Sequence, residues 1–395
     1  MNAFWWIVAG QIVSLFGNAA LRFALPLYLL RQTDSASLYG MVTALAMLPA
    51  LVGMLLGGVL ADRHRKARVM AGLDMVTACI SAGTAAALGF APIVPVILLA
   101  LGSLYAIQGL YQPAVRASLP LVLEDTQLVR GNAIVQIVDT VDELLGPLLG
   151  SILLETCGIR GLVLLCGGCF ALSALMEMQI KIPQDTPQTV ENAAGLRAAL
   201  WETVHYLRQQ PEVLHLAAIM AAVNLLEVPA ITVGVPVVVV QGLGRSDAEL
   251  GVVQALLSAG GLLGGAWAGW RAGHLQTRQG VRTLFCLCGL CAAMGVLLWV
   301  PPLADAGVAL CGAGFMAAAV VFNVWFFAQL QQLVPQGQLG RVTSCVAVLA
   351  CLTQPVGQVL YGALLENIAA GGVLLGAGGL GATVLLVLVR KPEKG

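Results

Sequence analysis

Charged residues are scarce in this sequence. Only 10% of its 395 residues are Asp, Glu, Lys or Arg, whereas a soluble domain has about 25%. Hydrophobic residues make up 59% of the chain, and the mean hydropathy is +0.89. A chain of this kind cannot enclose all of its apolar surface and still present a charged exterior, so most of that surface must face lipid. The composition excludes a soluble globular protein and indicates one that crosses a membrane many times.

Three other absences narrow the function. The formal net charge is zero, so no basic excess is available to bind nucleic acid. The nucleotide-binding pattern G-x-x-x-x-G-K-[ST] does not occur, so ATP is not expected to drive the protein. The four histidines, His64, His205, His215 and His274, are dispersed along the chain. This dispersal argues against a catalytic constellation, and we expect the protein not to be an enzyme.

The ten cysteines do not form a pattern typical of a metal centre. Most of them lie inside apolar runs, where a thiol behaves as a small hydrophobic side chain. Cys166-Gly-Gly-Cys169 and Cys288-Gly-Leu-Cys291 have a redox-like spacing, but neither is accompanied by a second ligand pair or a histidine cluster. We expect no metal and no cofactor.

Apolar runs long enough to cross a bilayer recur twelve times. A helix needs about 20 residues to cross a hydrocarbon core of ~30 Å. The expected spans are 4–30, 38–60, 69–90, 95–116, 128–155, 160–181, 211–240, 248–271, 281–300, 305–333, 341–366 and 371–390. The sequence therefore predicts an all-α membrane protein with 12 transmembrane helices.

The basic residues indicate the orientation of these spans. If the spans alternate in direction, sixteen Lys and Arg residues fall on the side of the N-terminus, and only Arg31, Arg160 and Arg245 fall on the other. Cytoplasmic loops are the ones enriched in Lys and Arg. Both termini are therefore expected to be cytoplasmic.

The two halves of the chain repeat each other. A shift of 211 residues aligns Gly40 with Gly251, and later aligns Leu153-Leu154-Glu155 with Leu364-Leu365-Glu366. The same offset holds in two separated regions, and the matching spans have the same direction. The sequence therefore predicts parallel repeats of six helices each.

One extended hydrophilic connection separates the repeats. We expect an N-terminal six-helix bundle at 1–182, a cytoplasmic linker at 183–210 and a C-terminal six-helix bundle at 211–395. Apolar residues in the second part of the linker recur at helical spacing. They predict an amphipathic helix along the cytoplasmic surface.

Three stretches resemble the major facilitator superfamily. The loop after the second span reads GGVLADRHRKARVM (57–70), similar to that family's signature G-x-L-a-D-R-x-G-R-[RK]. YQPAVRASLPLVLEDTQLVRGNAI (111–134) and LGRVTSCVAVLACLTQPVGQVLYGALLE (339–366) further resemble its macrolide-efflux, drug:proton antiporter branch. The resemblance implies the major facilitator fold, with two six-helix domains around a central cavity, in the bacterial cytoplasmic (inner) membrane.

The resemblance also implies a gating loop. On the matched positions Asp62 is the signature carboxylate, and Arg63 and Lys66 are its basic partners. Such a charge cluster can bind helix ends of the other half and favour one state of the transporter. The basic residues would also serve as topology signals. Asp74, just past the loop, is included in this group.

The sequence departs from the family pattern at two places. Arg65 replaces the second Gly of the signature. The stretch LGSLYAIQGLYQP (101–113) contains no basic residue, although many drug antiporters of the superfamily have an Arg there that is associated with proton transfer. Proton coupling in this chain therefore has to rest on other residues.

Three acids interrupt the apolar run NAIVQIVDTVDELLGPLLGS (132–151). At 100° per residue, Asp139, Asp142 and Glu143 share one helix stripe with Gly146 and Gly150. Near the bilayer middle an ionised carboxylate facing lipid costs about 2.5–3.5 kcal/mol, so the acids are expected to line water, meet a cation or bind protons. The glycines are expected to let another helix approach closely, across the domain interface.

Two further charged residues join this proton or cation site. Arg22 in the first span could pair with Asp142 or Glu143, because the first and fifth helices are neighbours in this superfamily. A purely structural clamp between the Arg and the acids is the alternative. Glu227 lies near the middle of the seventh span, just before a proline, and is the second candidate for proton or cation binding.

Two other acids are given structural roles. Asp74 is expected to brace Arg63 or Arg68 at the cytoplasmic end of the third span. Glu177 lies one turn before Lys181 and is expected to form a helix pair with it at the membrane interface.

Amides and aromatic residues supply a candidate substrate cavity. Aromatic faces with a few amides suit a bulky amphipathic molecule. Packing or contact with lipid is the alternative for any single one of these residues. The candidates are Asn18, Tyr105, Gln108, Tyr111, Gln112, Asn224, Asn323 and Phe326.

These observations predict a secondary exporter of amphipathic small molecules, of the drug or macrolide type. The two halves would rock about a central site, and proton entry at the acid cluster would drive antiport. Its expected partners are the substrate, protons and the lipid bilayer, and it is expected to act as a monomer. A siderophore exporter or lysophospholipid transporter of the same fold, and a non-transporting receptor or scaffold, are the alternatives.

Overall fold

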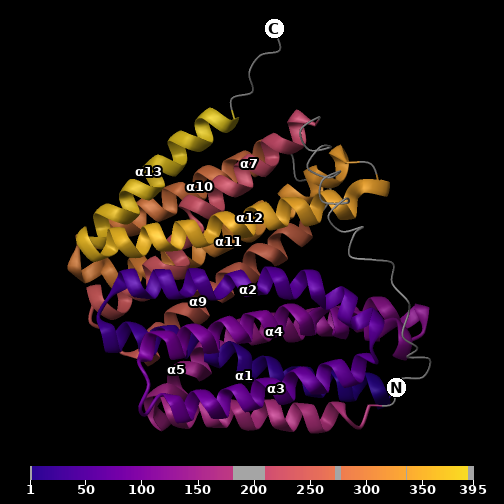
Figure 1. The fold of residues 1–395 in the computed structure, drawn as a ribbon. Coiled ribbons are helices and arrows are strands. Elements are labelled where there is room, and N and C mark those ends of the chain that lie inside the picture. Colours follow the sequence, from indigo (N-terminus) through magenta and orange to yellow (C-terminus); the bar gives the residue numbers. More distant parts are fainter. Residues whose placement is uncertain (1, 181–209, 272–276, 335, 390–395) are drawn as a thin grey trace. The chain divides into compact units, whose positions relative to one another are not determined.

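The computed structural model describes residues 2–180, 210–271, 277–334 and 336–389, and every regular element in these ranges is a helix (Figure 1). In the first half the helices are α1 (Asn2–Thr33), α2 (Ala36–Arg63), α3 (Lys66–Ala87), α4 (Ile93–Val122) and α5 (Asp125–Glu177). In the second half they are α7 (Pro211–Leu226), the π-helix η1 (Ala230–Gly234), α8 (Val235–Val237), the π-helix η2 (Val238–Gly242), α9 (Asp247–Trp270), α10 (Thr277–Leu297), α11 (Pro301–Leu333), α12 (Gln336–Asn367) and α13 (Ala370–Val389).

The described residues contain ten helices that are long and apolar enough to cross a membrane. The longest element, α5, has 53 residues and breaks at Gly158, where φ is 65° and ψ is 171°. At 1.5 Å per residue a straight helix of that length would be more than twice as long as a hydrocarbon core of ~30 Å. The two parts of α5 are therefore separate spans, as expected for 128–155 and 160–181. The total of twelve spans stays a prediction.

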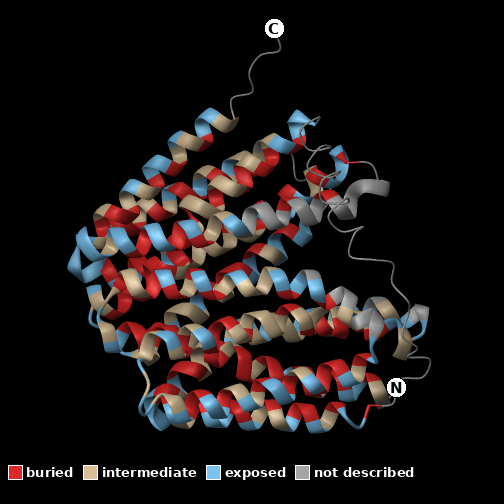
Figure 2. Cartoon of the chain, in the orientation of Figure 1, coloured by how far each residue is buried: buried red, intermediate tan, exposed pale blue. Residues whose placement is uncertain are grey.

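Large apolar side chains are exposed on the helices. Leu99 in α4, Leu263 in α9 and Leu310 in α11 are 70%, 71% and 72% exposed, and exposed residues recur along most helices (Figure 2). Soluble proteins rarely leave so many large apolar side chains in water. The exposed leucines fit helices whose outer faces contact lipid.

The helices group into two compact units. Unit 1 combines Met1–Asp34, Val42–Glu191 and Asp247–Val252, and unit 2 combines Ser35–Met41, Asn192–Ser246 and Val253–Gly395. Each unit therefore contains the first turns of a helix whose remainder belongs to the other unit: α2 begins in unit 2, and α9 begins in unit 1. The expected linker helix falls on residues outside the described ranges, apart from residue 210, and stays a prediction.

In unit 1, α1 packs along α5 and α4, and α3 packs against α4 and α5. The glycines of α5 allow the close approach of α1. A Cβ on Gly150 would lie 3.0 Å from the carbonyl oxygen of Ala20, and a Cβ on Gly146 would collide with Ala19. The expectation that these glycines face the other domain was wrong, because their partners are the small residues of α1 within the same unit.

In unit 2, α7 packs against α12 and α13, and α10 packs against α11 and α13. The helix α7 is interrupted before Pro229, as expected, and the π-helix η1 follows. The Ala230 N–H donates to the carbonyl oxygen of Glu227 at 3.1 Å. The carbonyl oxygen of Leu226 accepts instead from the hydroxyl of Tyr361, at 2.6 Å. A side chain of α12 thus satisfies a backbone group that the interruption leaves free.

Candidate functional site

The acid stripe of α5 lies beside α1 and α4 in unit 1. Asp139 and Asp142 are half-buried, and Glu143 is exposed. The amide Nε2 of Gln11 in α1 donates to Oδ1 of Asp139 at 3.4 Å. From α4, Gln112 and Arg116 also interact with Asp139. The expected neighbourhood of the first and fifth spans is confirmed, and it supplies these acids with polar partners.

Arg22 in α1 is the second cation near the stripe, after Arg116. Its Nη1 donates to Oε1 of Gln108 at 2.6 Å, and its guanidinium lies 4.2 Å from the ring centroid of Tyr105. Arg22 is also close enough to act electrostatically on both Asp142 and Glu143. Arg22 thus donates a hydrogen bond to Gln108 and is attracted to both acids, and its expected pairing with one of them stays a prediction.

Seven of the predicted residues therefore gather in unit 1: Arg22, Tyr105, Gln108, Gln112, Asp139, Asp142 and Glu143. Asn18 lies one turn before Arg22 on α1. It is buried, and its side-chain oxygen has no hydrogen-bond partner. A group of acids beside one guanidinium, an aromatic ring and several amides can bind protons and the polar part of an amphipathic molecule.

A second acidic pair of unit 1 is buried. Asp74 and Glu177 are only 2% and 0% exposed. Asp74 accepts a hydrogen bond from the hydroxyl of Ser14 at 2.8 Å, and Glu177 accepts one from the hydroxyl of Tyr111 at 2.5 Å. Among the described residues Asp74 forms no ion pair with Arg68, and the side chain of Arg63 lies outside the described part, so a bracing contact with Arg63 stays a prediction. Glu177 points into the helix bundle, while its expected partner Lys181 lies outside the described residues, so that pair stays a prediction.

Asp74 and Glu177 form a buried acidic pair with few polar partners. Asp74 and Glu177 interact electrostatically with each other, and each has one carboxyl oxygen without a hydrogen-bond partner. Among the described residues, no Lys or Arg forms an ion pair with either acid. Two like charges in such a place would repel each other without compensation.

Two predicted cavity aromatics are buried in the protein. Tyr111 is 4% exposed and is committed to Glu177. Phe326 is fully buried, with ring centroids of Phe322 and Phe327 at 6.0 and 5.4 Å, whereas Asn323 is exposed. The assignment of Tyr111 and Phe326 to an open cavity was wrong, because their rings serve packing.

Of the predicted gating loop, the side chains of Asp62 and Arg63 lie outside the described part of the structure. Lys66 is buried at the start of α3. Among the described residues, no group of three or more His, Cys, Asp or Glu side chains could hold a metal ion.

In unit 2, Glu227 is fully buried where α7 ends. Neither of its carboxyl oxygens accepts a regular hydrogen bond. The thiols of Cys288 and Cys291 lie near enough to interact with the carboxyl group as weak donors. Asn224, one turn earlier, donates to the carbonyl oxygen of Met220 at 3.0 Å. Glu227 is thus an acid placed in an almost apolar environment.

Gly381 of α13 makes room for this acid, since a Cβ there would collide with Oε1 of Glu227. We expect Gly381→Ala to displace the carboxyl group and to destabilise the protein by about 1–3 kcal/mol, the usual cost of overpacking. Thermal unfolding in detergent measures the loss. Gly379→Ala is the matched control, because nothing lies within 4 Å of that position. Equal midpoints for the two variants would contradict the expected contact.

Comparison with known proteins identifies the family. The family model described as Major Facilitator Superfamily matches residues 7–358. The chain is 22% identical over 371 residues to Macrolide efflux protein A of Streptococcus pyogenes, covering 92% of this chain and 90% of that one. It is 25% identical over 372 residues to Enterobactin exporter EntS of Salmonella typhi, covering 92% and 85%.

Solved structures agree on the fold. A D-xylose-proton symporter superposes with a TM-score of 0.75 at 14% identity, covering 99% of this chain and 98% of that one. A bacterial homologue of the iron transporter ferroportin in an inward-facing state superposes with a TM-score of 0.72 at 14% identity, covering 99% of both chains. Together with the match over most of the sequence, this shows that the chain is a multi-pass membrane transporter that belongs to the Major Facilitator Superfamily.

Proposed function

We propose that this transporter exports amphipathic small molecules from the bacterial cytoplasm in exchange for protons. The observation that supports it most is the acid stripe of α5. Arg22 acts on Asp142 and Glu143, Arg116 acts on Asp139, and the amides of α4 lie beside them; the apolar run around these acids places them within the bilayer in this proposal. Acids at that depth are costly unless they bind protons, cations or substrate.

In the proposed cycle, cargo and protons compete for the same negative field. Protonation of the stripe from outside weakens the binding of a cationic cargo and promotes its release. Loss of the proton to the cytoplasm restores the charge and so prepares the site for the next molecule. Both termini lie in the cytoplasm in this proposal, and the protein works as a monomer in the cytoplasmic membrane.

The relatives support export and suggest two classes of cargo. One is named for macrolide efflux and another for enterobactin export. The charges around the stripe favour the first class, because three acids outnumber their two nearby cations, Arg22 and Arg116, and an anionic cargo would need more cations. A siderophore exporter is therefore the second candidate, supported by the 25% identity to EntS.

Transport by purified protein in proteoliposomes tests the proposal. The lumen is made one pH unit more acidic than the medium, and a cationic amphipath, an anionic chelator and a lysophospholipid are offered separately. One pH unit is worth about 1.4 kcal/mol per proton, so exchange of one proton per cargo would sustain about tenfold accumulation. We expect this for the cationic cargo, with loss on adding a protonophore. Accumulation of the anion alone would favour the siderophore class, and no accumulation would contradict the proposal.

A further inference from the structure

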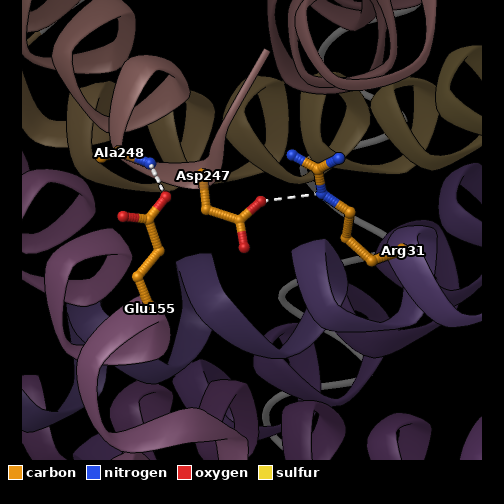
Figure 3. Close-up of polar contacts among 4 residues, drawn as sticks. All are labelled: Arg31, Glu155, Asp247 and Ala248. Carbon is orange, nitrogen blue, oxygen red and sulfur yellow. Dashed lines mark hydrogen bonds and ion pairs between the residues drawn. The ribbon is translucent and has the colours of Figure 1, made fainter. Parts of the chain in front are cut away.

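The first turn of α9 is held by a carboxylate from α5. The backbone N–H of Ala248 donates to Oε1 of Glu155 at 2.9 Å (Figure 3). Beside it, Nε of Arg31 forms an ion pair with Oδ1 of Asp247 at 2.9 Å. The first N–H groups of a helix lack partners within the helix, and a negative charge there also interacts favourably with the helix dipole. Glu155 therefore anchors the start of α9 within unit 1.

The first turn of α2 is held in the same way in unit 2. The backbone N–H of Ser37 donates to Oε2 of Glu366, at the end of α12, at 3.0 Å. The hydroxyl of Ser35 donates to the same oxygen at 3.2 Å. Here too an acid from the end of one long helix binds the start of another.

These two arrangements correspond through the internal repeat. The offset of 211 residues separates Glu155 from Glu366 and also Ser37 from Ala248. The helix packing beneath each acid repeats with the same offset. Gly251 packs on Pro147 and Ser151, and Gly40 packs on Gln358 and Gly362. The same construction therefore occurs twice, on separate stretches of the chain.

Each of the two helix starts belongs to a different unit from the rest of its helix. The residues before Val42 belong to unit 2 although α2 continues in unit 1, and the residues up to Val252 belong to unit 1 although α9 continues in unit 2. A movement of one unit against the other must therefore pull both helix starts from their places or bend both helices. If the helices do not bend, the two helix starts are expected to be released in the same movement.

We propose that Glu155 and Glu366 are paired latches, which hold the starts of α9 and α2 in one state of the transporter and release them together. The inference builds on the proposed transport cycle and names residues that control it. Both acids are exposed, so each interaction is weak enough to break during turnover. The ion pair of Arg31 with Asp247 reinforces the α9 latch.

Hydrogen exchange of the full chain in lipid nanodiscs tests the latches, read by mass spectrometry on peptides that cover 35–41 and 247–252. We expect Glu155→Ala to speed exchange about fivefold in 247–252, the upper range for one charge at a helix start. Because the latches release together, exchange in 35–41 should rise as well. Glu366→Ala should give the converse pattern.

The effect on the distant helix start decides the matter. An acid that only caps its own helix would change one peptide and leave the other as it was, and this result would overturn the proposal, as would no change in either peptide. Glu124→Ala is the control, since Glu124 is exposed and makes no side-chain cap bond. If an Ala variant exchanges faster in all its peptides, the substitution has destabilised the whole protein. Glu155→Gln and Glu366→Gln then replace the Ala variants, and exchange is compared in the same two peptides. No cargo or gradient is needed, so failure here is distinct from failure of the proposed exchange of cargo for protons.

Discussion

Asp142→Asn is expected to lower accumulation of a cationic cargo from about tenfold to none under a gradient of one pH unit. The amide has nearly the shape of the carboxyl group, but it cannot take up and release a proton. Asp142 is half-buried, and both Arg22 and Glu143 act on it electrostatically. Protonation of Asp142 therefore changes the charge of the whole site. In the Asn variant this change is impossible, so the pH gradient can no longer drive accumulation of the cargo.

The same proteoliposomes separate coupling from binding. Without a gradient, Asp142→Asn should still let cargo equilibrate, because Arg22, Gln108 and Tyr105 keep their mutual contacts. Glu124→Gln changes an exposed acid and serves as the control, with full accumulation expected. Asp139→Asn and Glu143→Gln, measured in parallel, show which of the other acids also contribute to proton coupling. Gradient-driven accumulation in all three stripe variants would refute coupling at this site.

Glu227→Leu is expected to stabilise the protein by about 1–3 kcal/mol and at the same time to abolish gradient-driven accumulation. The gain follows because the substitution removes a buried carboxyl group that has no hydrogen-bond partner. The loss follows if the protein keeps this costly group for proton binding. Thermal unfolding and the flux assay measure the two effects on the same preparation.

Glu177→Leu is the matched comparison, because Glu177 is equally buried but accepts a hydrogen bond from Tyr111. There the substitution strands the Tyr111 hydroxyl and should destabilise the protein by about 1–3 kcal/mol. Opposite signs for the two variants would distinguish an acid with no hydrogen-bond partner on either oxygen from an acid with a partner on one oxygen. A destabilised Glu227→Leu protein, or one that still accumulates cargo, would remove Glu227 from the mechanism.

Much of the fold could be predicted, because a bilayer imposes simple rules on sequence. Apolar length located most spans, and the need to satisfy every backbone group in lipid makes such runs helical. The break at Gly158 also fell between two expected spans. Helical periodicity correctly put Asp139, Asp142 and Glu143 on one stripe, since that requires only the geometry of a single helix.

The partners of those helix faces could not be predicted in the same way. Periodicity gives the residues on a face but not the helix that the face meets. For Glu177 the sequence suggested a partner on the same helix, Lys181, four residues away. The hydrogen bond from Tyr111 on another helix could not be predicted in this way. Gly146 and Gly150 were correctly taken as a point of close approach but were given the wrong partner. A signal for Glu177 existed in Ser173, one turn earlier, which also lies buried in the same apolar run.

The break at Gly158 has a consequence for biosynthesis. A positive φ at Gly158 separates the two spans of α5, with helical residues directly on both sides of the break. A nascent chain with so short a connection has to enter the bilayer as a helical hairpin, both arms at once. The orientation of the sixth span is thereby set by the fifth, whatever charges follow it.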